Sequence, residues 1–191
     1  GGGIPSCSLE ERREVDLVRF ANSYYPFFST EAKKIGDAAL YFTEIMSHIK
    51  GSILSLAPGC RGRLSLEQYL ALADGRGSNL DATQREVIYK MFLKYKSMKD
   101  SDHPLDYDIA DAVYHVYSAL ASSGYRGPMM NTVSVDEVQD LLPAQIALFK
   151  FVCTDVRGFV FAGDTAQTIA GGVGFRFETL NDIFYSEFGL S

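Results

Sequence analysis

Residues 132–140 read Thr132-Val133-Ser134-Val135-Asp136-Glu137-Val138-Gln139-Asp140, a short β-prone run that ends in carboxylates. Residues 159–164 read Phe159-Val160-Phe161-Ala162-Gly163-Asp164, a second apolar run with the same kind of ending. Between them Pro143 is placed to begin a helix, because the first helical turn does not need its missing N–H. Strand, helix and strand in this order predict a mostly parallel sheet, whose ligands bind beyond the carboxyl ends of the strands. The expected fold class is therefore α/β, with both acidic segments at the ligand-binding edge.

The sequence before this region predicts helices. A helix is expected from about Leu9 to Tyr25, and a second from about Glu31 to Lys50, where apolar residues recur every three or four positions. Two capping-box patterns then predict two further helix starts, at Ser65 with Gln68 and at Asp81 with Gln84. We therefore divide the chain into a helical subdomain over residues 1–128 and an α/β part over residues 129–191.

The predicted helix after Asp81 carries a row of lysines with tyrosines between them. These residues are Lys90, Lys94, Lys96 and Lys99, with Tyr89 and Tyr95. Cations next to aromatic rings suit the backbone and bases of a single nucleic-acid strand. A solvated helix face gives the same pattern and is the favoured interpretation.

Composition limits the class of protein. The chain has 191 residues, of which 47% are hydrophobic, enough for a folded core. It contains no run of eighteen apolar residues and no basic start followed by an apolar stretch, so we expect no membrane span and an intracellular location. Three scattered cysteines and three scattered histidines indicate neither a disulfide framework nor a zinc site.

Negative charge is concentrated near the end of the chain. The net charge is −6, and residues 131–191 hold eight acidic but only three basic side chains. Carboxylates are the side chains that hold a magnesium ion beside phosphates, so this distribution favours a metal-phosphate site. A solvated sheet edge would also explain it.

The two acidic segments form a recognisable pair of motifs. Val135-Asp136-Glu137-Val138-Gln139-Asp140, followed by Gly163-Asp164-Thr165-Ala166-Gln167-Thr168-Ile169, resembles the Walker B motif and the next motif of the UvrD/Rep-like superfamily-one helicases. Leu105-Asp106-Tyr107-Asp108-Ile109 also resembles the acidic-aromatic segment that precedes Walker B in that family. The resemblance covers roughly residues 105–185. Within the family it is similar to the helicase-like regions of large eukaryotic proteins with TPR and ankyrin repeats.

The resemblance implies a fold, an activity and residue roles. The fold would be part of a RecA-like P-loop NTPase sheet, and the cofactors would be ATP and Mg²⁺. Asp136 would hold Mg²⁺, through water, and Glu137 would polarise the attacking water. Gln167 would sense the terminal phosphate. Hydrogen bonds from three further residues would support this coupling, namely Asp164, Gln139 and Asp140. A carboxylate pair at one strand end can divide the two catalytic tasks.

The chain departs from the family pattern in two places. It contains no G-x-x-x-x-G-K-[ST] loop and no Gly-Lys dipeptide, so we expect that loop upstream in a longer protein and no ATP hydrolysis by this chain alone. Residues 170–174 read Ala-Gly-Gly-Val-Gly where the family has an aromatic residue and an arginine. Phe175-Arg176-Phe177 could replace those nucleic-acid contacts or could be ordinary strand or core residues.

Three hypotheses remain at this point. The first is part of an ATP-dependent helicase or translocase whose partners are single-stranded DNA or RNA and the rest of the same motor, including a second RecA-like domain. The second is an inactive RecA-like scaffold. The third, with the least support, is a nuclease that holds metal through Asp136, Glu137 and Asp164.

Overall fold

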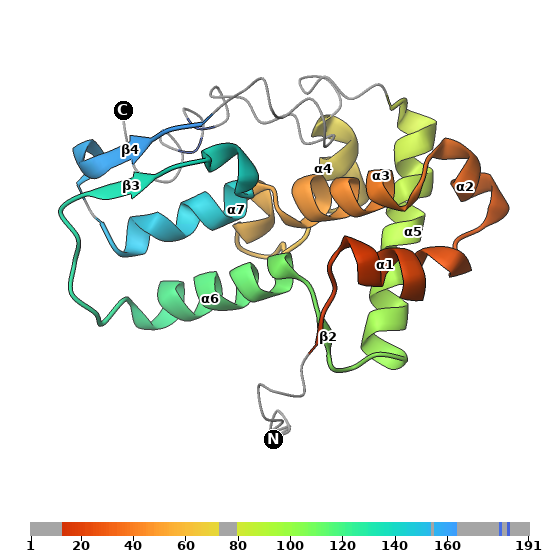
Figure 1. Ribbon diagram of the computed structural model, residues 1–191, viewed down its shortest axis with the longest axis horizontal. Coiled ribbons are helices and arrows are strands. Elements are labelled where there is room, and N and C mark those ends of the chain that lie inside the picture. The colour runs from red at the N-terminus through yellow and green to blue at the C-terminus, as the bar shows by residue number, and fades with distance from the viewer. Residues whose placement is uncertain (1–12, 73–79, 154, 164–179, 181–182, 184–191) are drawn as a thin grey trace.

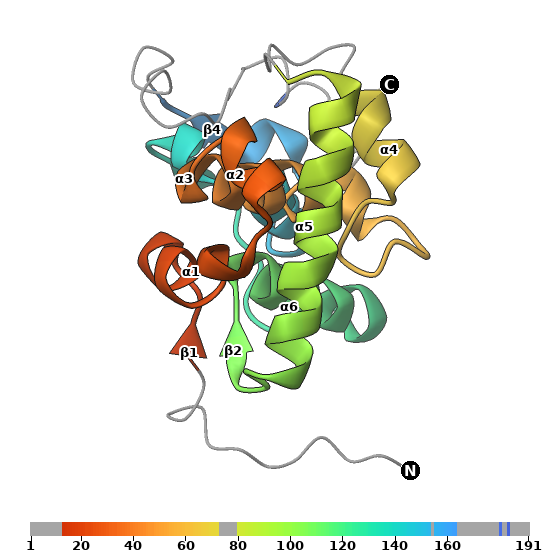
Figure 2. The same ribbon diagram turned by 90° about the vertical axis from the view of Figure 1, so that its right-hand side faces the viewer.

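The computed structural model describes residues 13–72, 80–153 and 155–163, together with Leu180 and Ile183. Figures 1 and 2 show a helical part and a smaller part built on strands. The strands are β1 (Arg13–Glu14), β2 (Asp106–Tyr107), β3 (Val133–Val135) and β4 (Phe159–Phe161). The α-helices are α1 (Leu17–Ser23), α2 (Thr30–Ile35), α3 (Ala38–Thr43), α4 (Leu66–Ala71), α5 (Ala82–Ser101), α6 (Ile109–Ser123) and α7 (Pro143–Ile146). A π-helical segment, η3 (Glu44–Lys50), continues α3, and short 3-10 turns are η2 (Tyr25–Phe27), η4 (Ile53–Leu56), η6 (Val138–Asp140), η7 (Ala147–Phe151) and η8 (Val156–Gly158).

Within the described residues the strands form two parallel pairs. β3 lies beside β4 with Val133 opposite Phe159 and Val135 opposite Phe161, and β1 lies beside β2. The parallel β3–β4 pair, with α7 and the η7 turn between its strands in sequence, confirms the predicted strand-helix-strand order. The α/β class is therefore confirmed.

The strand part is layered. Val138 and Ile146 are buried together and pack with Val135, Phe149 and Phe161, so α7 and η7 cover one face of the β3–β4 sheet. A second cluster, which includes Val113, Ala144 and Ala147, joins α7 and η7 to α6. Figure 1 shows the same order, with α7 between the sheet and α6. The β3–β4 sheet thus packs on α7 and η7, which in turn pack on α6.

The helical part has its own aromatic core. Phe20, Tyr24 and Tyr95 are fully buried, and the ring centroids of Tyr24 and Tyr95 lie 4.8 Å apart at a steep angle. Edge-to-face pairs of this kind add to the stabilisation from burial. The long helix α5, which carries Tyr95, runs the length of this part in both views. It is the element against which the other helices of this part are arranged.

Local signals explain where several helices begin. The predicted capping boxes at Ser65 with Gln68 and at Asp81 with Gln84 are both confirmed, and they start α4 and α5. A third box, Asp108 with Asp111, starts α6 and was not predicted. Each box gives side-chain partners to backbone N–H groups that the first turn leaves free.

The predicted single helix from Glu31 to Lys50 is wrong. The chain is extended at Gly36, and Asp37 then begins a new helix by accepting a hydrogen bond from Leu40 N at 3.0 Å. A β-carbon at Gly36 would also collide with the Leu40 side chain. The apolar period continues through the break because both pieces bury the same side of the chain.

The first predicted helix also starts later than expected. Arg13–Glu14 is strand β1, and α1 begins after Asp16, whose side chain accepts from Arg19 N at 2.7 Å. Leu9 lies outside the described residues. Two residues of strand leave no alternation to detect, and their pairing with β2 depends on a segment more than ninety residues away.

A tight loop over residues 57–63 brings its backbone against α6. Three of its residues have a positive φ, namely Gly59 (91°), Arg61 (52°) and Gly62 (74°). A β-carbon at Gly62 would lie 2.7 Å from the ring of Tyr114, whereas one at Gly59 would meet nothing within 4 Å. The two glycines therefore share a backbone requirement and differ in their surroundings.

This difference makes a matched test. We expect Gly62→Ala to lower the free energy of unfolding by about 2–4 kcal/mol, the sum of backbone strain and overpacking against Tyr114. Gly59→Ala should cost only about 1 kcal/mol, from strain alone. Urea unfolding of both variants measures the difference, and equal losses would show that Tyr114 does not hold the loop.

Candidate active site

The carboxyl end of β3 turns directly back onto the end of β4. Ala162 N donates to Val135 O at 2.9 Å, and Val138 N donates to Ala162 O at 3.0 Å. These two bonds enclose Asp136 and Glu137 in a turn whose side chains are exposed. The first acidic motif and the glycine of the second therefore meet at one sheet edge, as the strand order predicts.

Glu137 forms hydrogen bonds with Asp136 and Gln139. The amide of Gln139, only 7% exposed, donates through Nε2 to Glu137 Oε2, and Glu137 N donates to Asp136 Oδ1 at 3.0 Å. Gly163 lies against the Gln139 carboxamide so closely that a β-carbon there would collide with Oε1. The sequence predicted that Gln139 supports this site, and the structure shows that it orients the Glu137 carboxylate.

The backbone of Glu137 is strained. Its φ of 51° and ψ of 42° lie in the left-handed region, which among the described non-glycine residues only Arg61 otherwise enters with positive φ. An L-residue in this region costs roughly 1–2 kcal/mol relative to ordinary backbone. Such outliers gather at functional sites, where surrounding contacts hold them in place.

The carboxylates of Asp136 and Glu137 are suited to a cation. Neither is paired with a lysine or arginine among the residues that the structure describes. Across those residues no cluster of three or more His, Cys, Asp or Glu side chains is gathered to hold a metal by itself. Magnesium ordinarily takes one or two protein carboxylates and completes its shell with phosphate oxygens and water, so the pair fits that ion when a phosphate ligand accompanies it.

The remaining predicted site residues are placed as follows. Asp140 is exposed in the η6 turn, where its backbone N donates to Glu137 O at 2.9 Å. Asp164 and Gln167 lie outside the described residues, as does the stretch 170–177. The structure therefore brings together Asp136, Glu137, Gln139 and Gly163.

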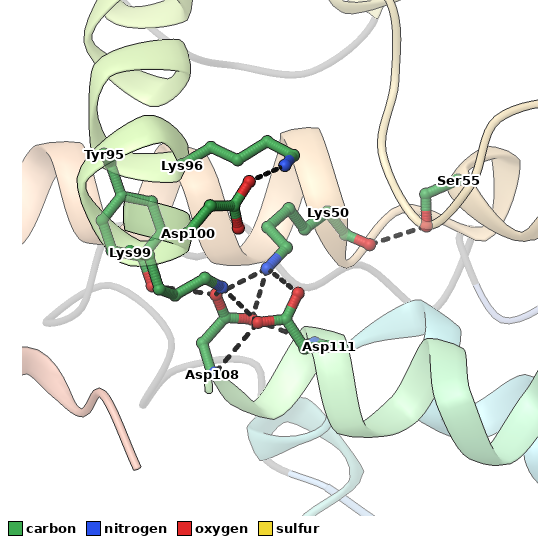
Figure 3. Close-up of polar contacts among 8 residues, drawn as sticks. All are labelled: Lys50, Ser55, Tyr95, Lys96, Lys99, Asp100, Asp108 and Asp111. Carbon is green, nitrogen blue, oxygen red and sulfur yellow. Dashed lines mark hydrogen bonds and ion pairs between the residues drawn. The ribbon is translucent and has the colours of Figure 1, made fainter. Parts of the chain in front are cut away.

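A second polar centre surrounds Asp108, in the acidic-aromatic segment before α6. Its side chain is fully buried and lies among Lys50, Lys99 and Tyr95 (Figure 3). Lys50 Nζ is 2.5 Å from both carboxylate oxygens, Lys99 Nζ is 2.7 Å from Oδ2, and the Tyr95 hydroxyl donates to Oδ2 at 2.9 Å. Asp111 accepts from both lysines at the outer side of the cluster.

Burial and charge set the ionisation of this centre. Burial would raise the pKa of Asp108, but the ammonium groups of Lys50 and Lys99 outweigh it and hold that pKa well below its usual range. Burial would lower the pKa of Lys99, and its two aspartate partners reverse that effect and raise it. The pKa of the Tyr95 hydroxyl is raised by burial and by its bond to Asp108. At neutral pH Asp108 and Lys99 are therefore charged, while the Tyr95 hydroxyl keeps its proton and donates it to Asp108.

The neighbouring Asp106 is a similar centre. Its buried carboxylate accepts hydrogen bonds from Arg19 Nε at 2.8 Å, from Arg19 Nη2 at 2.9 Å and from the Tyr24 hydroxyl at 2.7 Å. Arg13 Nε lies 3.1 Å from its Oδ1. Burial alone would raise the pKa of Asp106, and these donors lower it instead. Asp106 thus ties β2 to β1 and α1.

These centres correct the interpretation of the α5 lysines. Lys99 and Tyr95 are buried, so they belong neither to a solvated face nor to a nucleic-acid surface. Lys96 pairs with Asp100, and Lys94 donates to the carbonyl of Phe27. The sequence signal at Asp108 and Asp111 is a capping-box pattern, which marks the start of α6 but not its lysine partners.

Comparison with known proteins identifies the family of this chain and a similar human protein. The family model of the UvrD/REP helicase N-terminal domain matches residues 59–181, a range that includes both Asp108 and the Asp136–Asp140 turn. The chain is 31% identical over 177 residues to the human TPR and ankyrin repeat-containing protein 1. That alignment covers 92% of this chain and 6% of the relative, so the chain spans a small part of that protein. No solved structure matches the chain. Among the described residues no helix is both long and apolar enough to cross a membrane.

Removing the Asp108 charge should be costly. Asp108→Asn removes the buried counter-ion of two ammonium groups and leaves them only the partly exposed Asp111, so we expect a loss of about 3–5 kcal/mol in the free energy of unfolding. Asp100→Asn removes the same charge from the exposed pair with Lys96 and should cost about 0–1 kcal/mol. Urea unfolding compares them, and similar losses would mean that the buried cluster adds no stability of its own.

The buried aspartates also predict the acid side of the stability curve. Because folding lowers the pKa of Asp108 and Asp106 below 3.8, each stabilises the fold above that pH and loses this effect as the pH falls through the folded value. Each can contribute a slope of up to about 1.4 kcal/mol per pH unit. The free energy of unfolding is measured from pH 6 downward. Below a pH of about 4 it should fall less steeply with decreasing pH for Asp108→Asn than for the unchanged chain.

Proposed function

Because the chain belongs to the UvrD/REP helicase N-terminal domain family, we propose that it is part of an ATP-dependent motor acting on nucleic acid, with the β3–β4 edge as its ATPase centre. The observation that carries this proposal is the turn after β3, where two carboxylates are exposed, have no lysine or arginine partner among the described residues, and one is fixed by a buried glutamine. In parallel sheets the carboxyl ends of strands are where nucleotides bind. We extend the proposal to the fold, as part of a RecA-like sheet preceded by an inserted helical subdomain over residues 1–128.

The described side chains divide the work. Asp136, at the start of the turn, would bind Mg²⁺ through water, while Glu137 would accept a proton from, and so orient, the attacking water. Gln139 would act through Glu137, because its buried amide donates to one oxygen of that carboxylate. Bound ATP with Mg²⁺ supplies the phosphate to be cleaved and the cation that neutralises its charge.

The second motif enters the proposal through the family alone. By the family resemblance, Asp164 would support the same centre through hydrogen bonds. Gln167 would report the terminal phosphate to the nucleic-acid surface, and Asp140 would support the turn that carries Glu137. The partners proposed are a single strand of DNA or RNA and the remainder of the motor.

The decisive experiment uses Glu137→Gln in the full-length protein. ATP hydrolysis, measured with and without single-stranded DNA and RNA, should fall by about a hundred- to ten-thousand-fold, since positioned proton transfer contributes that much. Binding of a fluorescent ATP analogue should persist, because the change keeps the shape of the side chain. Glu67→Gln removes an equal charge from the exposed face of α4 and should leave both activities unchanged.

Two outcomes would contradict the proposal. ATP hydrolysis that neither DNA nor RNA stimulates would contradict the proposal that the motor acts on nucleic acid. A folded full-length protein that binds no nucleotide and hydrolyses none would instead support the scaffold hypothesis.

A further inference from the structure

A cleft between the 57–63 loop, α5 and α6 is a second functional candidate. It is lined by Lys50, Arg61, Gly62, Arg63, Phe92, Tyr95, Lys96, Lys99, Asp100, Asp111 and Tyr114. Five of these side chains are cationic and two are anionic, which gives the lining a net charge of +3 in a chain whose net charge is −6. A positive cleft in an acidic protein marks a place where an anion is favoured.

The cationic groups of the cleft are not equivalent. Figure 3 shows Lys50, Lys96 and Lys99 directed at aspartates, and each is paired. Arg61 and Arg63 form no ion pair with any residue that the structure describes. Their two guanidinium groups, each a planar fork of donors, therefore supply the charge that the cleft has to offer.

The backbone holds both arginines in place. Gly62 N donates to Ser55 O at 3.1 Å, and Arg63 N donates to Cys60 O at 3.2 Å. Arg61 stands between them with a φ of 52°, and the ring of Tyr114 covers Gly62 on the α6 side. The backbone position from which the Arg61 side chain extends is therefore fixed before a ligand binds.

The size of the cleft limits the ligand. Its volume is about 90 Å³, well below the about 300–1,000 Å³ of pockets that enclose whole small molecules. It can therefore take one anionic group of a ligand whose remainder lies outside. Guanidinium groups match the oxygens of a phosphate, so a phosphate is the anionic group that Arg61 and Arg63 would bind best.

We propose that this cleft binds a backbone phosphate of a single nucleic-acid strand through Arg61 and Arg63. The inference depends on the proposed function, because it assumes that the protein binds such a strand. It assigns a contact that lies on the helical side of the molecule and uses none of the carboxylates at the β3–β4 edge.

The test is the salt dependence of binding in the full-length protein. Affinity for labelled single-stranded DNA and RNA oligonucleotides is measured across a series of salt concentrations for the unchanged protein and for Arg61→Gln with Arg63→Gln. Each neutralised phosphate contributes about 0.7 to the slope of log affinity against log salt for a single strand, so the double variant, which loses one phosphate contact, should lose about 0.7. Its affinity at moderate salt should fall by roughly five- to tenfold per arginine.

Two further double variants control the result. Arg126→Gln with Arg157→Gln removes equal charge from exposed positions that do not line the cleft, and its slope should be unchanged. Arg61→Lys with Arg63→Lys keeps the charge and should restore the slope. An unchanged slope in the glutamine variant, with tight binding by the unchanged protein, would overturn this inference and leave the proposed function intact. Failure of the unchanged protein to bind any single strand would overturn both.

Discussion

The carboxylate of Asp108 lies out of water between two ammonium groups, and three helical elements meet at this cluster. Lys50 ends the π-helical segment, Lys99 lies in the last turn of α5, and Asp108 begins α6. A buried charge is tolerated only when its partners are fixed in place, so the cluster sets how α6 is placed against the helical part. α6 also packs on α7, and α7 packs on the β3–β4 sheet. The position of α6 therefore helps to set the position of the strand ends that carry Asp136 and Glu137. The cleft with Arg61 and Arg63 shares the same two lysines in its lining.

The parts of this arrangement that sequence could predict are those set by neighbours in the chain. The β3 and β4 strands, the helix start at Pro143 and the capping boxes at Ser65 and Asp81 depend on a few adjacent residues, and all are confirmed. Asp136 and Glu137 were expected at a strand end for the same reason, and they are found there. Asp164 and Gln167 stay predictions, since they lie outside the described residues.

The parts that could not be predicted depend on residues far apart in the chain. Lys99 has the same spacing as the exposed lysines of α5, and only its contact with Asp108 and Asp111 makes it a buried residue. Lys50 reaches Asp108 across 58 positions, a pairing that no local pattern records. The break at Gly36 was missed because its apolar period continues across it, and β1 because two residues show no alternation. Gln139 was predicted as a supporting residue, but its contact with Gly163 needed both strand ends in view.

The left-handed backbone at Glu137 sets the catalytic role proposed for its carboxylate against the stability of the fold. Glycine and asparagine adopt that conformation at less cost than glutamate does, so selection for a more stable fold alone would replace the carboxylate. A glutamate kept at this position in other members of the family would then be evidence that the proposed ATP hydrolysis is kept. Replacement by glycine or asparagine would accompany its loss. Under the proposed function, the residue at position 137 would thus indicate from a gene sequence alone whether ATP hydrolysis has been kept.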